Sequence, residues 1–174
     1  MEHKDICNHS CHVTSINKSV CQTLSEMDWE RGIWNAAYSG DRERVVQLIQ
    51  KSRNVVDTVN ALDNAGYSAL HYAARNGHVE VCQILIKKGA SLNVQTKSGK
   101  ATPLHKAVAT GKNSTVKFLI ESGAKLDILD DDGKSLLHKA VEYNHMDLVD
   151  ILIKACPALE SIKNNKGLLP SEYN

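Results

Sequence analysis

The sequence predicts an all-α repeat fold, and three observations support this prediction. A shift of 33 to 35 residues brings the chain into register with itself and aligns three histidines, His71, His105 and His138, which lie 34 and 33 residues apart. Glycines recur with the same period, at Gly66, Gly99, Gly133 and Gly167. The copies also contain apolar residues spaced three to four apart, as an amphipathic helix requires. A fixed period of this length indicates supersecondary units that stack and bury a shared core.

The third copy contains the run Thr102-Pro103-Leu104-His105-Lys106-Ala107. This motif, together with a period near 33 residues, resembles the repeat core of the ankyrin family. The resemblance covers roughly residues 30–172. It implies an ankyrin-repeat solenoid of β-turn/helix-turn-helix units, in which every repeat is one β-turn followed by two helices.

Composition excludes several classes of protein. The 174 residues are 42% hydrophobic, which is enough to bury a core in one array. They carry 21 basic and 20 acidic side chains, so the net charge of +1 draws the chain to neither nucleic acid nor membrane. No apolar run of 18 residues occurs, the first 25 residues lack a signal-peptide core, and the five cysteines are odd in number and scattered. We therefore expect a cytoplasmic protein that also reaches the nucleus, and we expect it to be a monomer.

The period divides the chain into segments. Residues 1–24 show neither helical nor strand periodicity and are predicted to form a flexible N-terminal arm rich in Cys and His. Residues 25–31 are predicted to form a capping helix, since Ser25 and Asp28 have N-cap spacing, with Met27 and Trp29 laid over the first repeat. Ankyrin repeats are expected at residues 32–65, 66–98, 99–132 and 133–166, with a truncated start of a fifth repeat at residues 167–174.

The first helix of repeats two to four begins with a predicted hydroxyl cap. Thr102 can accept a hydrogen bond from an unpaired amide, and Pro103 suits the first helical position, where a missing N–H costs nothing. Ser68 and Ser135 occupy the place of Thr102 in the neighbouring repeats. The histidine three residues after each cap can bond back to the cap and to the loop of the next repeat. We therefore interpret the three recurring histidines as structural.

The helix interiors and ends repeat as well. Alanines in the first helices predict close packing between neighbouring repeats, at Ala36, Ala37, Ala73, Ala74, Ala107 and Ala140. The second helices carry an inward apolar set, in which Cys82 occupies a valine position and is predicted to be a small buried hydrophobe. Gly77 and Gly111 are predicted to end first helices in a left-handed turn, and Asn144 takes this place in the fourth repeat.

The first and fourth repeats depart from the pattern. Trp34 stands where the other repeats have histidine, and the longer exit loop of the first repeat is expected to leave the edge of the array as an excursion over residues 53–59. Cys156-Pro157 replaces the Gly-Ala pair that closes the second and third repeats, which predicts a reshaped turn. We expect residues 167–174 either to lie across the fourth repeat or to leave an exposed apolar end.

The sequence contains no pattern of an enzyme site. It has no Gly-rich phosphate loop, no Gly-x-Ser-x-Gly and no His-Glu-x-x-His, so we predict a non-enzymatic protein with no catalytic residue, cofactor or metal. Asp130, Asp131 and Asp132 are interpreted as a solvated β-turn tip. The arm leaves one alternative open, because it contains potential zinc ligands, although no second closely spaced pair accompanies the first: Cys7, His9, Cys11, His12 and Cys21.

The family resemblance also implies a surface for a protein partner. Ankyrin proteins bind through their β-turn tips and the exposed side of their first helices, which together form a concave strip. Carried over to this sequence, the strip comprises Tyr38, Tyr67, Arg75, Asn76, Lys97, Lys100, Lys106, Thr110, Lys134, Lys139, Glu142 and Tyr143. The five lysines would form a basic band and the three tyrosines would be aromatic anchors, so that an acidic partner surface would complement the strip. Charge reversal at Lys106 and Lys139 is expected to weaken partner capture and to leave thermal stability nearly unchanged.

Together these observations predict a scaffold or adaptor that binds another protein through its concave surface. Two alternatives remain open. The first is an inhibitor or regulator of a kinase or transcription factor that uses the same surface. The second is a zinc- or redox-responsive protein that acts through the Cys/His arm.

Overall fold

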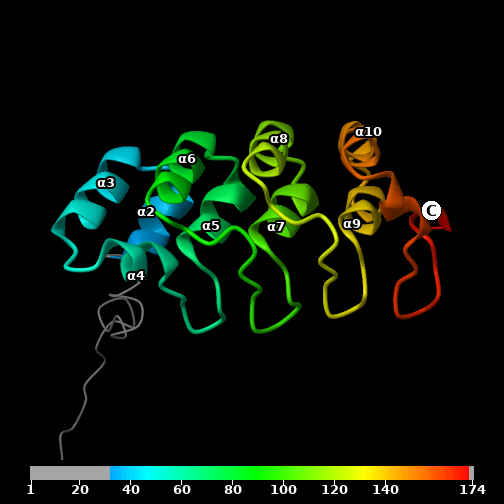
Figure 1. Cartoon of the computed structure of the whole chain (residues 1–174), viewed down its shortest axis with the longest axis horizontal. Helices are drawn as coiled ribbons and strands as arrows, with labels where there is room; N and C mark the ends of the chain where they lie inside the picture. The colour runs from blue at the N-terminus through cyan, green and yellow to red at the C-terminus, as the bar shows by residue number, and fades with distance from the viewer. Residues whose placement is uncertain (1–31, 173–174) are drawn as a thin grey trace, which may run out of the picture.

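The computed structural model describes residues 32–172, and these residues form a single stack of helical pairs. The first helices of the four pairs are α2 (Ile33–Ser39), α5 (Ala69–Asn76), α7 (Pro103–Ala109) and α9 (Leu136–Glu142). The second helices are α3 (Arg42–Lys51), α6 (Val79–Lys87), α8 (Asn113–Glu121) and α10 (Met146–Ala155). Figure 1 shows the two sets as two parallel rows, with the long loops projecting on the side of the first helices. The predicted helical repeat fold is therefore confirmed. The predicted arm and the predicted capping helix lie outside the described residues.

Each first helix of repeats two to four starts with a reciprocal pair of hydrogen bonds between the cap and the histidine. The side chain of Thr102 accepts from the backbone N–H of His105, and Nδ1 of His105 accepts from the N–H of Thr102, both at 3.3 Å. Ser68 with His71, and Ser135 with His138, form the same capping box. The predicted hydroxyl caps are confirmed, and the cap satisfies amides that the helix leaves unpaired.

The same imidazoles tie neighbouring repeats together. Because Nδ1 accepts a backbone N–H, the proton of the neutral ring lies on Nε2, which can then donate. Nε2 of His71 donates to the carbonyl of Ala101 at 3.1 Å, and Nε2 of His138 donates to the carbonyl of Leu168 at 3.0 Å. In the first repeat the indole Nε1 of Trp34 donates to the carbonyl of Ala61 at 3.0 Å. Trp34 therefore binds the exit loop of its own repeat, whereas His71 and His138 bind the next repeat.

His105 differs from His71 and His138 in its contact with the next repeat. Its Nε2 is buried and has no hydrogen-bond partner of ordinary geometry in residues 32–172. Burial lowers the pKa of both His71 and His105 to about 4, because the charged ring would lose its hydration. Both rings are therefore neutral at pH 7.

Small and branched side chains fill the interior, as predicted. The alanines of the first helices are fully buried at Ala36, Ala37, Ala73, Ala74, Ala107 and Ala140. In the second helices Val81, Cys82 and Leu85 are buried, and burial raises the pKa of the Cys82 thiol to about 12. Cys82 is therefore a core side chain and not a nucleophile at neutral pH.

The long exit loop of the first repeat contains a helix, α4 (Val55–Asn60), that packs against the array. Asn54 caps α4 by accepting from two backbone amides, and Val59 is fully buried. Asn60 fastens α4 to the second repeat, since its Nδ2 donates to the carbonyl of Gly89 and its Oδ1 accepts from the N–H of Ser91. The expected excursion is therefore wrong, because these contacts hold the segment against its neighbours.

The C-terminal segment lies against the fourth repeat. Cys156 has a φ of −152° and begins a short 3-10 helix at Pro157–Ser161, in which Leu159 is buried. A second 3-10 helix, Pro170–Glu172, contacts α9 and buries Pro170. The predicted reshaped turn is confirmed, and the described residues of this segment cover part of α9.

First helices end in left-handed turns, as predicted. Gly77 and Gly111 have φ values of +85° and +67°, and Asn144 has a φ of +57°. At Gly111 a Cβ would lie 2.7 Å from the ring of His145, whose Nε2 donates to the carbonyl of Ala109. Gly123 also has a positive φ of +89°, but a Cβ there would meet nothing within 4 Å.

We predict that Gly111→Ala is more destabilising than Gly123→Ala. Both variants incur the strain of alanine at positive φ, about 1 kcal/mol. Gly111→Ala must also displace His145 and lose its hydrogen bond, which adds about 1 kcal/mol. Urea unfolding of both variants measures the difference, and equal losses would contradict the proposed role of His145.

We also predict that stability falls between pH 6.5 and pH 4. In this window the unfolded chain protonates His71 and His105 and the folded chain does not, so acid favours unfolding. The difference between the two pKa values corresponds to about 3 kcal/mol for each imidazole. Urea unfolding as a function of pH measures this slope, which should be shallower in His71→Gln. An unchanged slope in that variant would refute the prediction.

Candidate functional site

The predicted partner-binding residues all lie on the first helices, at their C-terminal ends or on the loops that precede them. They are Tyr38 on α2, Tyr67, Arg75 and Asn76 at α5, Lys97, Lys100, Lys106 and Thr110 at α7, and Lys134, Lys139, Glu142 and Tyr143 at α9. Because the first helices stack in one row, these residues share one side of the array (Figure 1). Tyr38 and Tyr143 are the most exposed aromatic residues described, at 46% and 50%.

The loops before α5 and α9 are held by carboxylates that face the first helix. Asp63 accepts from the backbone N–H groups of Ala65 and Tyr67, and its second oxygen accepts from the hydroxyl of Tyr72. One oxygen of Asp130 likewise accepts from two backbone N–H groups, and its other oxygen lies 2.8 Å from Nζ of Lys139. Tyr72 and Lys139 occupy equivalent positions, one residue after the histidine. This position therefore fastens the helix to its own loop in both repeats.

The third repeat lacks this carboxylate. Thr96 takes the place of Asp63, donating from its hydroxyl to the carbonyl of Ser98 and accepting from the N–H of Ala101. Lys106, the counterpart of Tyr72, consequently has no acid to bind in its own loop. Its Nζ lies instead 4.8 Å from the centroid of the Tyr67 ring, at the distance of a cation–π contact.

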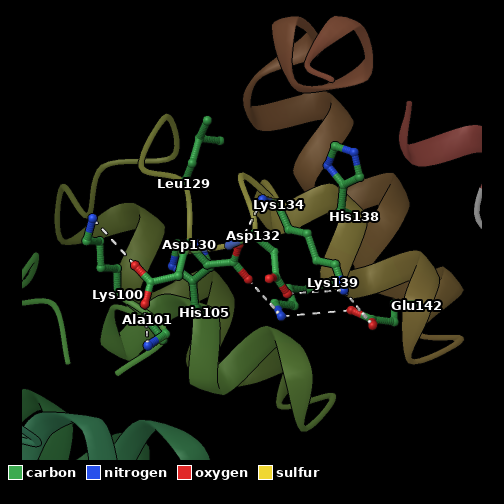
Figure 2. A network of polar contacts seen from close by, with 12 residues as sticks. Lys100, Ala101, His105, Leu129, Asp130, Asp132, Lys134, His138, Lys139 and Glu142 are labelled. Carbon is green, nitrogen blue, oxygen red and sulfur yellow. Dashed lines mark hydrogen bonds and ion pairs between the residues drawn. The ribbon is translucent and has the colours of Figure 1, made fainter. Parts of the chain in front are cut away.

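The lysines of the fourth repeat form a compact set of ion pairs (Figure 2). Lys134 lies 2.8 Å from Glu142 and 3.8 Å from Asp132. Lys139 lies 2.8 Å from Asp130 and 3.8 Å from Glu142. These pairs balance the charge of both lysines, so the expected basic band is neutralised in this part of the surface.

The expectation of a solvated β-turn tip is wrong for Asp130, because this residue is only 9% exposed. Burial alone would raise the pKa of this carboxyl. The ion pair with Lys139 and the backbone N–H of Lys134 outweigh burial and hold the pKa below its usual value. Asp131 and Asp132 are exposed, as predicted, and Asp131 lies 3.5 Å from Lys100.

Aromatic side chains connect the first and second repeats. Tyr72 contacts Tyr38 edge-on, with ring centroids 6.3 Å apart, and stacks on Tyr67 at 5.3 Å. Sequence reasoning missed Tyr72 as a member of this surface. The signal was present, since Tyr72 is in register with Lys106 and Lys139, which were both predicted. Burial and the hydrogen bond to Asp63 raise the pKa of Tyr72, so its hydroxyl stays protonated.

The surface is hollowed between the third and fourth repeats. A cleft of about 370 Å³ lies there, and its lining includes Ser98, Lys106, Asp131, Lys139 and Tyr143. The cleft therefore joins both tips to both first helices. Its lining combines charges of both signs with one exposed aromatic ring, which suits the side chains of a polypeptide more than a single small anion.

Within residues 32–172, His, Cys, Asp and Glu side chains are nowhere grouped in threes that could hold a metal ion. None of the helices in this range has the length and apolar character needed to cross a lipid bilayer. The Cys/His arm lies outside this range, so the zinc- or redox-responsive alternative stays a prediction.

Stacked helical pairs that offer one continuous surface define a helical repeat protein of the solenoid class. The chain belongs to the ankyrin-repeat family, because the family model described as ankyrin repeats in three copies matches residues 10–96 and 93–164. This family generally mediates protein–protein interaction and is generally non-enzymatic.

Individual relatives agree with this assignment. Human ankyrin repeat domain-containing protein 39 is 50% identical over 90 residues, which cover 52% of this chain and 45% of that protein. The bovine protein of the same name is 57% identical over 68 residues, covering 39% of this chain and 35% of that protein. Human BCL-6 corepressor-like protein 1 is 33% identical over 84 residues, covering 48% of this chain and 4% of that protein. The chain thus spans less than half the length of these curated relatives. The comparisons confirm the expected resemblance of the chain to ankyrin repeat domain-containing protein 39, which the sequence suggested at residues 27–34 and 156–159.

We predict that Lys139 contributes to stability, contrary to the expectation from sequence. Lys139→Met leaves the buried carboxylate of Asp130 without its cation and should lower the free energy of unfolding by about 2 kcal/mol. Lys100→Met is the control, because its ion pair with Asp131 is largely exposed and should contribute less than about 0.5 kcal/mol. Thermal and urea unfolding of the two variants decide this, and equal stabilities would count against the buried pair.

Proposed function

We propose that the protein is a non-enzymatic adaptor that binds another protein through the row of first helices and β-turn tips. The observation that carries this proposal is the distribution of exposed aromatic rings. Tyr38 and Tyr143 lie at opposite ends of the row, on helices whose interiors are fully buried. Aromatic side chains on rigid elements are typical anchors of protein interfaces, because little conformational entropy is lost when they are covered.

The hydrogen bonds between repeats support rigid presentation of this surface. His71 and His138 each bond to a carbonyl of the next repeat. At the tips, the N–H of Lys97 donates to Ala65 and the N–H of Asp131 donates to Gly99. The loops that would touch a partner are therefore connected before binding. We propose that the protein acts as a monomer in the cytoplasm and the nucleus.

The alternative is an inhibitor or regulator of a kinase or transcription factor that uses the same surface. The similarity to a segment of BCL-6 corepressor-like protein 1 supports this alternative. The two functions share their binding physics and differ in the outcome for the partner. A single stoichiometric partner that loses activity when bound would favour the regulator.

We predict that Tyr38→Ala combined with Tyr143→Ala weakens partner binding by about tenfold or more. Partners are identified by cross-linking in cells and mass spectrometry, and their affinity for the purified variants is then measured. Val56→Ala combined with Met146→Ala is the matched control, because both side chains are 55% exposed and lie outside the first helices. Equal weakening by the control pair would place the interface elsewhere and refute the proposed function.

A further inference from the structure

Three cations on the partner-binding surface have no carboxylate to neutralise them. Among the ion pairs of residues 32–172, none includes Arg75, Lys97 or Lys106. Lys100, Lys134 and Lys139, by contrast, all have acidic partners. The unmatched charges belong to the second and third repeats, whereas the matched ones lie toward the fourth.

The three unmatched cations belong to the junction of the second and third repeats, where Lys106 contacts Tyr67. Nζ of Lys106 lies over the Tyr67 ring. Lys97 is fixed beside the preceding tip, since its backbone N–H donates to Ala65 and its Nζ donates to the carbonyl of Asn64. The tips approach so closely that a Cβ at Gly66 would lie 2.8 Å from the backbone nitrogen of Lys97.

Arg75 completes the group from the same pair of repeats. Its carbonyl accepts a hydrogen bond from the hydroxyl of Thr110 at the end of α7, so this end of α5 is fixed against the third repeat. Its side chain is exposed and lies three residues after Tyr72 on α5, so it shares a helix face with the ring that stacks on Tyr67. Arg75 thus neighbours Tyr72 on its own helix, and Lys106 covers Tyr67 from the next repeat.

The carboxylate of Asp63 does not offset these charges by direct pairing. Asp63 directs one oxygen to two backbone amides and the other to the hydroxyl of Tyr72. An exposed cation without a fixed counter-charge attracts an anionic partner, and the attraction grows when several such cations share one surface.

We propose that the junction of the second and third repeats binds an acidic peptide segment of the partner, which presupposes the protein-binding function proposed above. Its Asp or Glu side chains pair with Arg75, Lys97 and Lys106, and a neighbouring apolar side chain packs on Tyr67 and Tyr38. Lys106 turns from the Tyr67 ring to the incoming carboxylate, which uncovers the ring for that contact. Carboxylates are favoured over phosphate here because the group has one arginine, whereas phosphate recognition favours several guanidinium forks.

The test uses a fluorescein-labelled peptide of alternating Glu and Leu, titrated against the full chain and followed by anisotropy. The peptide in which Gln replaces Glu should bind at least about tenfold more weakly, and salt should weaken the Glu peptide. The double variant Arg75→Gln/Lys106→Gln should lose about tenfold in affinity for the Glu peptide. The control double variant, Lys117→Gln/Lys154→Gln, removes the same charge from the exposed side of α8 and α10 and should bind normally.

Several outcomes would overturn the inference. These are no binding of the Glu peptide, equal binding of the Gln peptide, equal loss in both double variants, or tighter binding of a phosphoserine-Leu peptide. Failure of the acidic-peptide inference can be distinguished from failure of the proposed function. If a captured partner still depends on Tyr38 and Tyr143 but not on Arg75 and Lys106, the surface binds protein and only its acidic specificity is wrong.

Discussion

The structure depends on a buried imidazole that joins the start of a first helix to the next repeat. An imidazole accepts from its own cap residue and, in the second and fourth repeats, donates to a carbonyl about thirty residues further along the chain. This geometry requires the neutral ring, which burial enforces for His71. The capped helix and the stacked helix are thus stabilised by the same side chain. A residue that appears once per repeat can therefore build both the unit and the array.

Much of the fold was predictable because these interactions are local and periodic. Hydroxyl caps, left-handed helix ends and buried alanines depend on residues within one repeat, and each was placed correctly at Ser68, Thr102, Gly77 and Ala73. The helix α4 was missed because Asn54 and Asn60 act in an insertion that has no counterpart elsewhere in the chain. The buried side chain of Val59 and the bonds from Asn60 to Gly89 and Ser91 show in the structure that the insertion is packed.

The candidate surface was predictable in position but not in charge. Lysines repeat on the first helices, so the sequence predicts where they lie. For Lys139 and Lys106, neutralisation depends on the loop residue nine or ten positions earlier, which is Asp130 in one case and Thr96 in the other. The sequence does not distinguish the five lysines by their charge. In the structure, ion pairs divide them into a neutralised group and an unpaired group, and the expected centre of partner binding moves toward Tyr67.

Thr96 is the loop residue that leaves Lys106 in the unpaired group. It is almost completely buried, so no partner can read it directly. An aspartate in its place would supply the carboxylate that the equivalent loop positions of the neighbouring repeats possess, and Lys106 would turn inward. A substitution at a concealed turn position would thus change the outward charge of a helix while every outward-facing residue is kept.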